Sequence, residues 1–436
     1  DPAAAMGKFS ELAAKNSTDP GTLSAQLWLA GRFFEQQDYL QAGQASAAIL
    51  TNATVRAVRG DTWYRAKLWA AEAGRKLQNF DSSAEHYREL INDKAAPPEI
   101  QSAALLAMAL IARGTDAVSL SGAQAGISAD GTYGKGRIAG IEPKRVRAEL
   151  DAGRVVIVAG FQGVSDGSET TTLGRGGSDT SAVALAAALG ADRCQIFTDV
   201  RGVYTADPRA VPAARQLSVV GYEEMLELAN QGAQVMQTRA VELGWVNNVA
   251  IEVLSSFEEH PGTVIKEDTQ VEKRNKVRGL AADTKVAKVT MVAVPDKPGI
   301  ARAVFDPLSA ANINVDMIVQ NVSHDGTTDL SFTTSRADLA AARPVLEKIR
   351  AEIGARALEI DENVAKVSIV GAGIQNAPGY AARMFGTLAD AKINIQMIST
   401  SEIRITCIVS ESDASRALQA LHDTFDLATP DAVDAE

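Results

Sequence analysis

Short apolar runs and helical patterns alternate through the middle of the chain. Residues 155–159 are a continuous, mostly β-branched run, which predicts a strand buried on both faces. The next stretch is polar and rich in glycine, which predicts a loop. After it, Ser178 and Asp179 stand in front of apolar residues at helical spacing, so we expect a helix that these two side chains cap.

Further strands and helices are expected on both sides of this stretch. Residues 117–120, 194–198 and 250–255 predict strands, of which 194–198 is expected to be buried, and residues 142–151 and 222–229 predict helices. Alternating strands and helices indicate an α/β fold with a parallel sheet and crossover connections. In such a fold, ligands bind at the carboxyl ends of the strands.

The first 95 residues are rich in Ala, Gln and aromatic residues and have almost no β-branched runs. Residues 30–39 are echoed by residues 73–80, and a second amphipathic helix follows each block. Helix pairs that repeat at this spacing are solenoid-like and resemble tetratricopeptide repeats, which would form a protein-interaction surface. The alternative is a small helical bundle with accidental self-similarity. Pro97 and Pro98 mark the expected boundary, near residues 94–98.

The last 150 or so residues contain an internal repeat, in which residues 288–320 correspond to residues 366–400. Each copy predicts a strand, a helix opened by Pro-Gly, two strands and a helix, which is an α+β ferredoxin-like plan. A Pro-Gly turn that opens a helix presents free N–H groups to a carboxylate. The alternative is a plain α+β domain that pairs subunits through sheet edges. Residues 426–436 predict a disordered acidic tail.

The charge balance argues against two classes of partner. A formal net charge of −11 over 436 residues does not suit nucleic acid or an anionic membrane, because either needs a basic face. Cys194 and Cys407 lie far apart within apolar runs, which predicts buried thiols in a reducing compartment. The apolar segments are too short to span a membrane, and no basic-then-apolar leader opens the chain, so we expect a cytoplasmic protein.

The loop before the predicted helix at residue 180 carries the first candidate chemistry. Free N–H groups at a helix start favour an anion, and a guanidinium adds a planar fork for carboxylate or phosphate. A plain strand-to-helix turn is the alternative, but the density of polar groups favours a small-anion site. Within ten residues stand Thr170, Thr171, Thr172, Arg175, Ser178 and Asp179.

Two long motifs identify a resemblance. Residues 171–179 read TTLGRGGSD and residues 198–209 read TDVRGVYTADPR, and both resemble signatures of the aspartate kinases in the amino-acid kinase family. Segments SGAQAGI at 121–127 and PGT at 261–263 also match, so the resemblance runs from about residue 102 to about residue 427. It implies that ATP, with Mg²⁺, phosphorylates L-aspartate to 4-phospho-L-aspartate, the first step of lysine, threonine and methionine biosynthesis.

The resemblance also implies roles for individual residues. Thr171, Thr172 and Arg175 would hold aspartate, and Arg175 and Asp179 would serve catalysis. Glu99 corresponds to the family's substrate glutamate. Read without the family, the second motif is a polar strand-to-helix connection; with it, we expect nucleotide-binding residues at Thr198, Asp199, Tyr204, Asp207, Arg209 and Gln234. No residue is assigned to a protein-held metal.

The C-terminal repeat resembles paired ACT domains, which bind small molecules in amino-acid biosynthesis. The resemblance implies lysine or threonine as effectors and a homo-oligomer formed through the ACT domains. The expected effector residues are Asp296, Pro298, Gly299, Ile300, Gln320, Asn321, Asn376 and Asn394. The expected fold class is therefore an α/β amino-acid kinase-like parallel sheet at residues 96–267, two α+β ACT domains at 280–355 and 360–428, and a preceding all-α helical-repeat segment at 1–95.

Two departures from the family pattern affect the expected rate. Aspartate kinases have a Lys-Phe-Gly-Gly-Thr-Ser loop, which has no counterpart in these residues, and Gln234 stands where the family has a second lysine. Both lysines would stabilise a charged transition state. The alternative function is therefore a catalytically impaired regulatory subunit that binds lysine or threonine and docks partners through the helical repeats.

Overall fold

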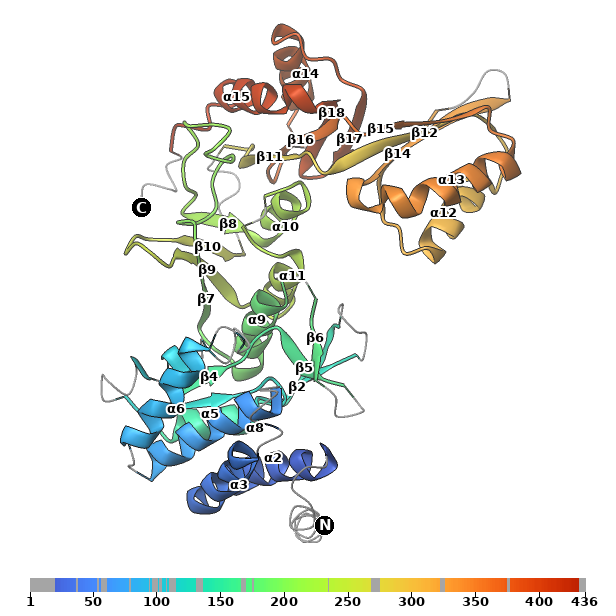
Figure 1. Ribbon diagram of the computed structural model, residues 1–436. Coiled ribbons are helices and arrows are strands. Elements are labelled where there is room, and N and C mark those ends of the chain that lie inside the picture. The colour runs from blue at the N-terminus through green and yellow to red at the C-terminus, as the bar shows by residue number, and fades with distance from the viewer. Residues whose placement is uncertain are drawn as a thin grey trace. The chain divides into compact units, whose positions relative to one another are not determined.

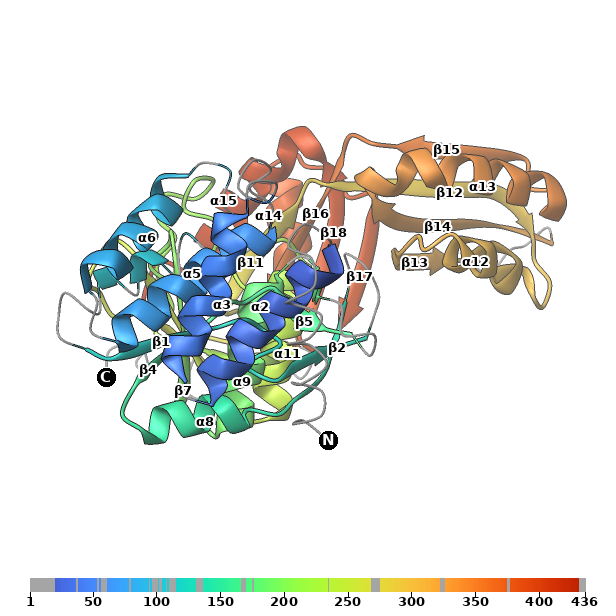
Figure 2. The same ribbon diagram turned by 60° about the horizontal axis from the view of Figure 1, so that its bottom comes forward.

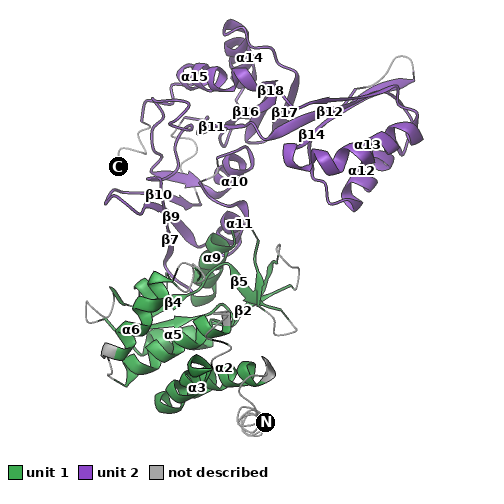
Figure 3. Cartoon of the chain, viewed as in Figure 1, with its two compact units in different colours: residues 1–189 green, residues 190–436 purple. Residues whose placement is uncertain are grey.

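The computed structural model divides the chain into two compact units, residues 1–189 and residues 190–436, and each is described by itself (Figure 3). The described residues are 20–36, 38–52, 55, 61–77, 80–93, 95, 101, 104–106, 108–109, 115–130, 136–165, 170–174, 176–233, 235–267, 275–321, 326–374 and 377–430. Among them, no helix is long and apolar enough to cross a membrane.

Six helices of unit 1 have defined bounds. They are α2 (Pro20–Glu35), α3 (Tyr39–Thr51), α5 (Asp61–Lys76), α6 (Phe80–Asn92), α8 (Lys144–Asp151) and α9 (Gly177–Leu189). The first four pack one against the next in chain order and form a layer of blue helices in Figure 2. The helix expected at residues 142–151 is α8. Helix α9 begins one residue before Ser178, so Asp179 lies in the first helical turn rather than at the cap.

The strands of unit 1 form two sheets. In one, β1 (Ala117–Leu120) pairs in parallel with β4 (Val155–Val158). The other has the order β3-β2-β5-β6, with β2 (Ile127–Ala129), β3 (Ile138–Ile141), β5 (Gln162–Val164) and β6 (Thr170–Thr172). The prediction of a continuous loop after residue 159 is therefore wrong. The β-branched threonines of β6 pair with β5, and β6 is an edge strand of the sheet.

The N-terminal helices share a core with the sheets. Phe34 and Ala73, from α2 and α5, are buried with Val118 and Ile127, from β1 and β2. Arg75 donates hydrogen bonds to Asp116 and to the carbonyl of Ala117. The segments before and after the boundary expected near residues 94–98 therefore pack together and form ion pairs. The N-terminal helices cover β1 and β2.

Unit 2 begins with a mixed sheet of order β7-β9-β10-β8. Its strands are β7 (Arg193–Thr198), β8 (Val219–Gly221), β9 (Ala250–Ser255) and β10 (Thr263–Lys266), and its helices are α10 (Tyr222–Asn230) and α11 (Thr238–Val246). Strands β7 and β9 are parallel, but β9 and β10 are antiparallel because a hairpin joins them, so the prediction of a purely parallel sheet is wrong.

The prediction of a fully buried strand at 194–198 is also wrong. The side chains of β7 alternate in exposure, with Cys194 buried and Phe197 61% exposed. Strand β4 likewise exposes Val155 instead of being buried on both faces.

The first C-terminal copy is a complete ferredoxin-like domain. Its elements are β12 (Val286–Pro295), α12 (Ile300–Ala310), β13 (Val315–Gln320), β14 (Thr327–Ser335), η2 (Arg336–Asp338), α13 (Leu339–Ile353) and β15 (Ala357–Asp361). The sheet order is β13-β14-β12-β15, and both helices pack on it (Figure 1). Strand β15 extends this copy beyond the end expected at residue 355.

The second copy borrows its fourth strand. It contains β16 (Val364–Val370), α14 (Tyr380–Asp390), β17 (Met397–Ser401), β18 (Arg404–Ser410), η3 (Glu411–Asp413) and α15 (Ala414–Thr424). The sheet order is β11-β16-β18-β17, in which β11 (Gly279–Asp283) precedes the first copy in sequence. The first copy is thus inserted into the second, which corrects the expected bounds of both. Leu427 is buried in this second core, so the expectation that the disordered tail begins at residue 426 is wrong.

Candidate functional site

The threonine strand β6 places one buried hydroxyl among the predicted aspartate contacts. Thr170 and Thr172 are exposed, whereas Thr171 is 2% exposed and lies on the opposite face of the strand. Thr171 Oγ1 has no hydrogen-bond partner among the described residues. Because a buried hydroxyl without a partner is unfavourable, this one is a candidate for binding a polar ligand.

The start of α9 is fixed to the preceding loop. Ser181 Oγ accepts a hydrogen bond from the Phe161 N–H at 3.3 Å and donates one to the Ser178 carbonyl at 2.9 Å. Asp179 lies half-buried in the same first turn, and burial raises the pKa of its carboxyl above the ordinary value. No hydrogen bond or ion pair to Asp179 is found in the described part of unit 1. A carboxylate in this state is typical of a functional site.

Four of the predicted site residues lie outside the described residues. They are Glu99, Arg175, Gln234 and Asn376. Their expected roles remain predictions from the sequence.

The predicted nucleotide motif continues into a closed loop, residues 203–217, which we call the nucleotide segment. Val203 O accepts a hydrogen bond from Leu217 N at 2.8 Å, and Arg215 O accepts one from Thr205 N at 2.9 Å. Thr263, at the start of β10, holds both ends: its hydroxyl accepts from Val203 N at 2.9 Å and donates to Leu217 O at 2.6 Å. The PGT match therefore has a structural role.

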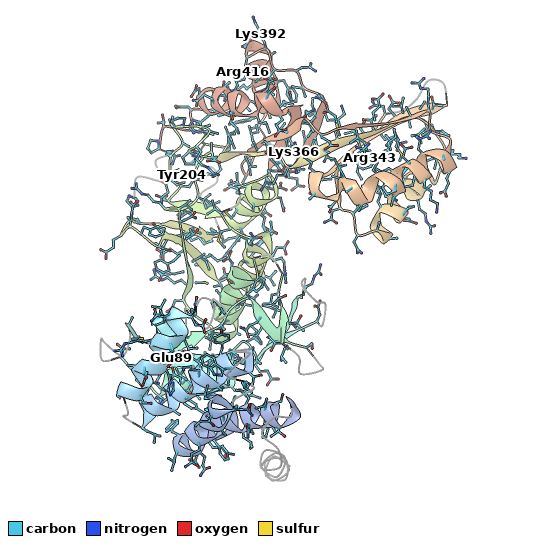
Figure 4. All side chains as sticks on the ribbon, viewed as in Figure 1. Glu89, Tyr204, Arg343, Lys366, Lys392 and Arg416 are labelled. Carbon is cyan, nitrogen blue, oxygen red and sulfur yellow. The ribbon has the colours of Figure 1, made fainter. Side chains whose placement is uncertain are left out.

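Three charged residues of this region, Asp199, Asp207 and Arg209, are exposed. Thr198 Oγ1 donates to Asp199 Oδ1 at 3.1 Å at the end of β7, and Tyr204 is half-buried (Figure 4). Arg209 donates two hydrogen bonds to the carboxylate of Asp207, from Nε at 3.0 Å and from Nη2 at 2.8 Å. This side-chain hydrogen bonding lowers the pKa of Asp207. The pair is exposed and contributes little to stability, so a phosphate can compete for the guanidinium.

The arrangement fits a nucleotide. One stretch combines hydroxyl and carboxylate groups, an aromatic ring and a guanidinium, which can meet ribose, base and phosphate respectively. The aspartate candidates lie in unit 1 and the nucleotide candidates lie in unit 2.

Sequence reasoning missed a buried contact behind the nucleotide segment. Thr205 Oγ1 lies 2.9 Å from Nε2 of His422, in α15 of the second ACT copy. The two residues are 217 positions apart, so no local pattern pointed to the pair.

The effector candidates of the first copy converge at one end of its sheet. Pro298 and Gly299 precede α12, and Ile300 is its first, buried residue; Gln320 ends β13, and Asn321 follows it. Asp296 N donates to Gly326 O at 2.9 Å, and Asp296, Gln320 and Asn321 are exposed. Asn394, in the second copy, lies three residues before the start of β17 (Met397–Ser401).

Comparisons with known proteins agree with this architecture. Residues 72–254 match the amino acid kinase family, and residues 288–353 and 367–425 each match an ACT domain. An aspartokinase of Pseudomonas aeruginosa is 53% identical over 329 residues, which are 75% of this chain and 80% of that protein. This chain belongs to the aspartokinase family. An aspartokinase of Mycolicibacterium smegmatis is 47% identical over 336 residues, 76% of this chain and 80% of that one.

Solved aspartokinases share the fold over nearly the whole chain. Aspartokinase III of E. coli, in complex with aspartate and ADP, superposes with a TM-score of 0.63 at 24% identity and covers 97% of this chain and 96% of that one. The aspartate kinase of Clostridium acetobutylicum gives a TM-score of 0.64 at 22% identity and covers 94% and 90%.

Proposed function

We propose that this aspartokinase uses MgATP to phosphorylate L-aspartate, forming ADP and 4-phospho-L-aspartate. The observation that carries the proposal is about 50% identity to aspartokinases over three quarters of the chain, including both motifs. ATP is the phosphoryl donor and Mg²⁺ accompanies its phosphates. The protein supplies positioning and charge stabilisation, on which phosphoryl transfer depends.

The residues divide between the two substrates. Thr171, Thr172 and Arg175 bind aspartate, with the Arg175 fork on a carboxylate and Glu99 as a further substrate contact. Asp179 orders the phosphoryl site. The nucleotide contacts are Thr198, Asp199, Tyr204, Asp207, Arg209 and Gln234. The unpartnered Thr171 hydroxyl supports the first group, and the exposure of Asp199, Asp207 and Arg209 supports the second.

The ACT pair binds lysine or threonine and feeds back on the kinase. The open turn at Gly299 and the exposed ends of β13 support this assignment, because free N–H groups at a helix start suit an amino acid's carboxylate. Aspartokinase III of E. coli has been crystallised with lysine and aspartate, with a TM-score of 0.60. We further propose pairing of subunits through the ACT sheets.

The second candidate function is an impaired regulatory subunit, which Gln234 favours. In that case, the helices α2 to α6 would bind a partner as tetratricopeptide-like repeats. Cys194 and Cys407 are buried free thiols, which supports a reducing, cytoplasmic location.

A coupled assay of ADP release tests the two functions. We expect ADP release from the full chain with MgATP to depend on L-aspartate. MgATP and lysine binding without any aspartate-dependent ADP release would instead support the regulatory subunit.

A further inference from the structure

The second ACT copy contacts the nucleotide segment through one buried polar pair. Thr205 and His422 are both fully buried, with Oγ1 and Nε2 2.9 Å apart. Thr205 belongs to the nucleotide segment, whereas His422 lies in the last turn of α15. A buried polar group is costly to leave without its partner, so the pair fixes how these two elements meet.

Other contacts attach the same stretch to the same ACT copy. Leu280 N, in the borrowed strand β11, donates to Thr205 O at 2.7 Å. Arg215 Nε donates to Leu427 O at 3.2 Å, just beyond α15. Ala206 and Val211 are buried in the hydrophobic core of the second ACT copy. The nucleotide segment therefore rests on this copy as well as on the kinase sheet.

Thr205 also organises the nucleotide segment internally. Its hydroxyl accepts a hydrogen bond from Arg215 N at 3.1 Å, across the loop. Its neighbour Tyr204 is half-buried, and Asp207, two residues on, is exposed. The position of the buried Thr205 therefore determines where these two candidate nucleotide contacts lie.

We propose that His422 is a positioning residue of the kinase reaction, which holds Thr205 and thereby keeps the nucleotide segment in the arrangement that binds MgATP. This proposal rests on the proposed function, in which that segment contacts the nucleotide. His422 is fully buried beneath the segment and acts through Thr205. The chemical class of ligand whose affinity it sets is a nucleoside triphosphate, not the amino-acid substrate.

Two polar variants of the full chain separate positioning from general stability. The amide of Gln in His422→Gln can reach the place of imidazole Nε2, whereas the shorter amide in His422→Asn reaches only that of Nδ1. We expect His422→Asn to bind MgATP about three- to tenfold more weakly, the equivalent of one net hydrogen bond, and His422→Gln to bind it as the wild type does. L-Aspartate affinity should stay unchanged in both. Ser415→Ala, at an exposed position of α15, is the matched control.

Calorimetric titration with MgATP and with L-aspartate gives the result. Equal MgATP affinity of the wild type and His422→Asn would overturn the proposal, and so would equal losses for both substrates, which indicate a general structural defect. If His422→Asn does not fold, Thr205→Val and Thr205→Ser ask the same question: Val should weaken MgATP binding and Ser should not, and equal affinities would overturn the proposal. A wild-type chain that does not bind MgATP would refute the proposed function itself.

Discussion

Lys366, labelled in Figure 4, donates a hydrogen bond from Nζ to Oδ2 of Asp316 at 2.9 Å and so joins the two ACT copies. Because the two ACT copies are repeats, a second pair of residues at the corresponding positions makes a similar contact. Lys288 stands at the position of Lys366 in the first copy, Gln396 stands at that of Asp316 in the second, and Lys288 Nζ donates to Gln396 Oε1 at 3.0 Å. Between the copies lies a separate buried cluster of Val286, Met317, Val364, Met397 and Ile408. The first strand of each copy therefore reaches the second strand of the other.

The two lysines should differ in their contributions to stability. Lys366 is almost fully buried and binds a carboxylate, so Lys366→Met should lower the free energy of unfolding by about 1 to 3 kcal/mol. Lys288 is half-buried and binds a neutral amide, so Lys288→Met, the matched control, should cost about 0.5 to 1.5 kcal/mol. Chemical denaturation at neutral pH measures both, and a larger loss for Lys288→Met would contradict the expectation.

The stabilisation by Lys366 should depend on pH. Burial acts to raise the pKa of Asp316, but the charge and hydrogen bond of Lys366 hold it below its ordinary value. The folded state therefore takes up this proton less readily than the unfolded state. The contribution is fully present above the unfolded pKa, about 3.9, and is lost as the pH falls through the lower folded pKa. The difference between the wild type and Lys366→Met should shrink over that acid range.

Thr171→Val should impair aspartate binding without lowering the stability of the free protein. The hydroxyl of Thr171 is buried without a described partner, so its removal should leave the melting temperature of the free protein unchanged or higher. Aspartate affinity should fall by about tenfold if this hydroxyl binds the substrate. Thr180→Val is the control, because Thr180 Oγ1 donates to Gly176 O at 2.8 Å and its loss should destabilise the fold. Unchanged aspartate affinity in Thr171→Val, measured by calorimetry, would refute the substrate role.

Gly299 allows a test of effector binding in the full chain. Lysine or threonine should raise the melting temperature of the wild type by mass action. Gly299 has φ of 95° at the start of α12, so Gly299→Val strains the turn by about 1 to 2 kcal/mol and should remove most of that shift. Gly354→Val, at φ of 73° after α13, carries similar strain away from the turn and should keep the shift. Equal shifts in both variants would place the effector elsewhere.

A shortened chain that ends at Lys266 would be a poor alternative to these variants. It would remove Leu280, which donates to Thr205 O, and would expose Ala206 and Val211. The kinase and ACT parts of unit 2 share these contacts, so point substitutions distinguish effector binding from loss of folding more clearly.

Arg75→Met should destabilise unit 1 strongly. Arg75 contacts Glu72, Asp116 and the Ala117 carbonyl, and burial raises the pKa of Glu72 even with Arg75 present. Without the guanidinium, the buried Glu72 carboxyl keeps, among the described residues, the hydrogen bond from Tyr87, so we expect a cost of about 3 to 5 kcal/mol. Arg88→Met, at an exposed position of α6, should change stability by less than about 0.5 kcal/mol. Similar melting temperatures would mean that the helices and the sheet are independent.

Local patterns were sufficient for some elements and not for others. The apolar segments at 117–120 and 155–158 form strands as predicted, although β4 is less buried than expected. Strand β6 was missed, since threonine and glycine in a motif read as a loop until a pairing partner is known. The exchange of β11 into the second ACT sheet depends on which of two similar sheets it reaches, and five residues do not encode that choice locally.

In the candidate site, too, local sequence patterns predicted some features, and other features depended on contacts between distant residues. The motifs were sufficient to predict candidate aspartate and nucleotide residues, because the chemistry of these candidates lies within short stretches of sequence. The contact between Thr205 and His422 depends on the packing of α15 against the nucleotide segment, and a single buried histidine in a helix gives no local sign of its partner. Burial and hydrogen bonding in the folded chain were needed to find it.

The last prediction concerns turnover and separates the two proposed functions. Gln234 stands in place of a family lysine. Removal of a single preorganised stabiliser of a transition state typically costs roughly 2.7 to 4 kcal/mol, which is about a hundred- to a thousandfold in rate. Such a loss should place turnover below the roughly 1 to 100 per second typical of kinases. MgATP binding should survive because the motif at 198–209 is intact. Gln234→Lys should raise whatever rate exists, with Asn230→Lys, at an exposed position at the end of α10, as a control for added charge. Ordinary kinase turnover by the unaltered chain would show that another cation, such as Lys8, stabilises the transferring phosphoryl group.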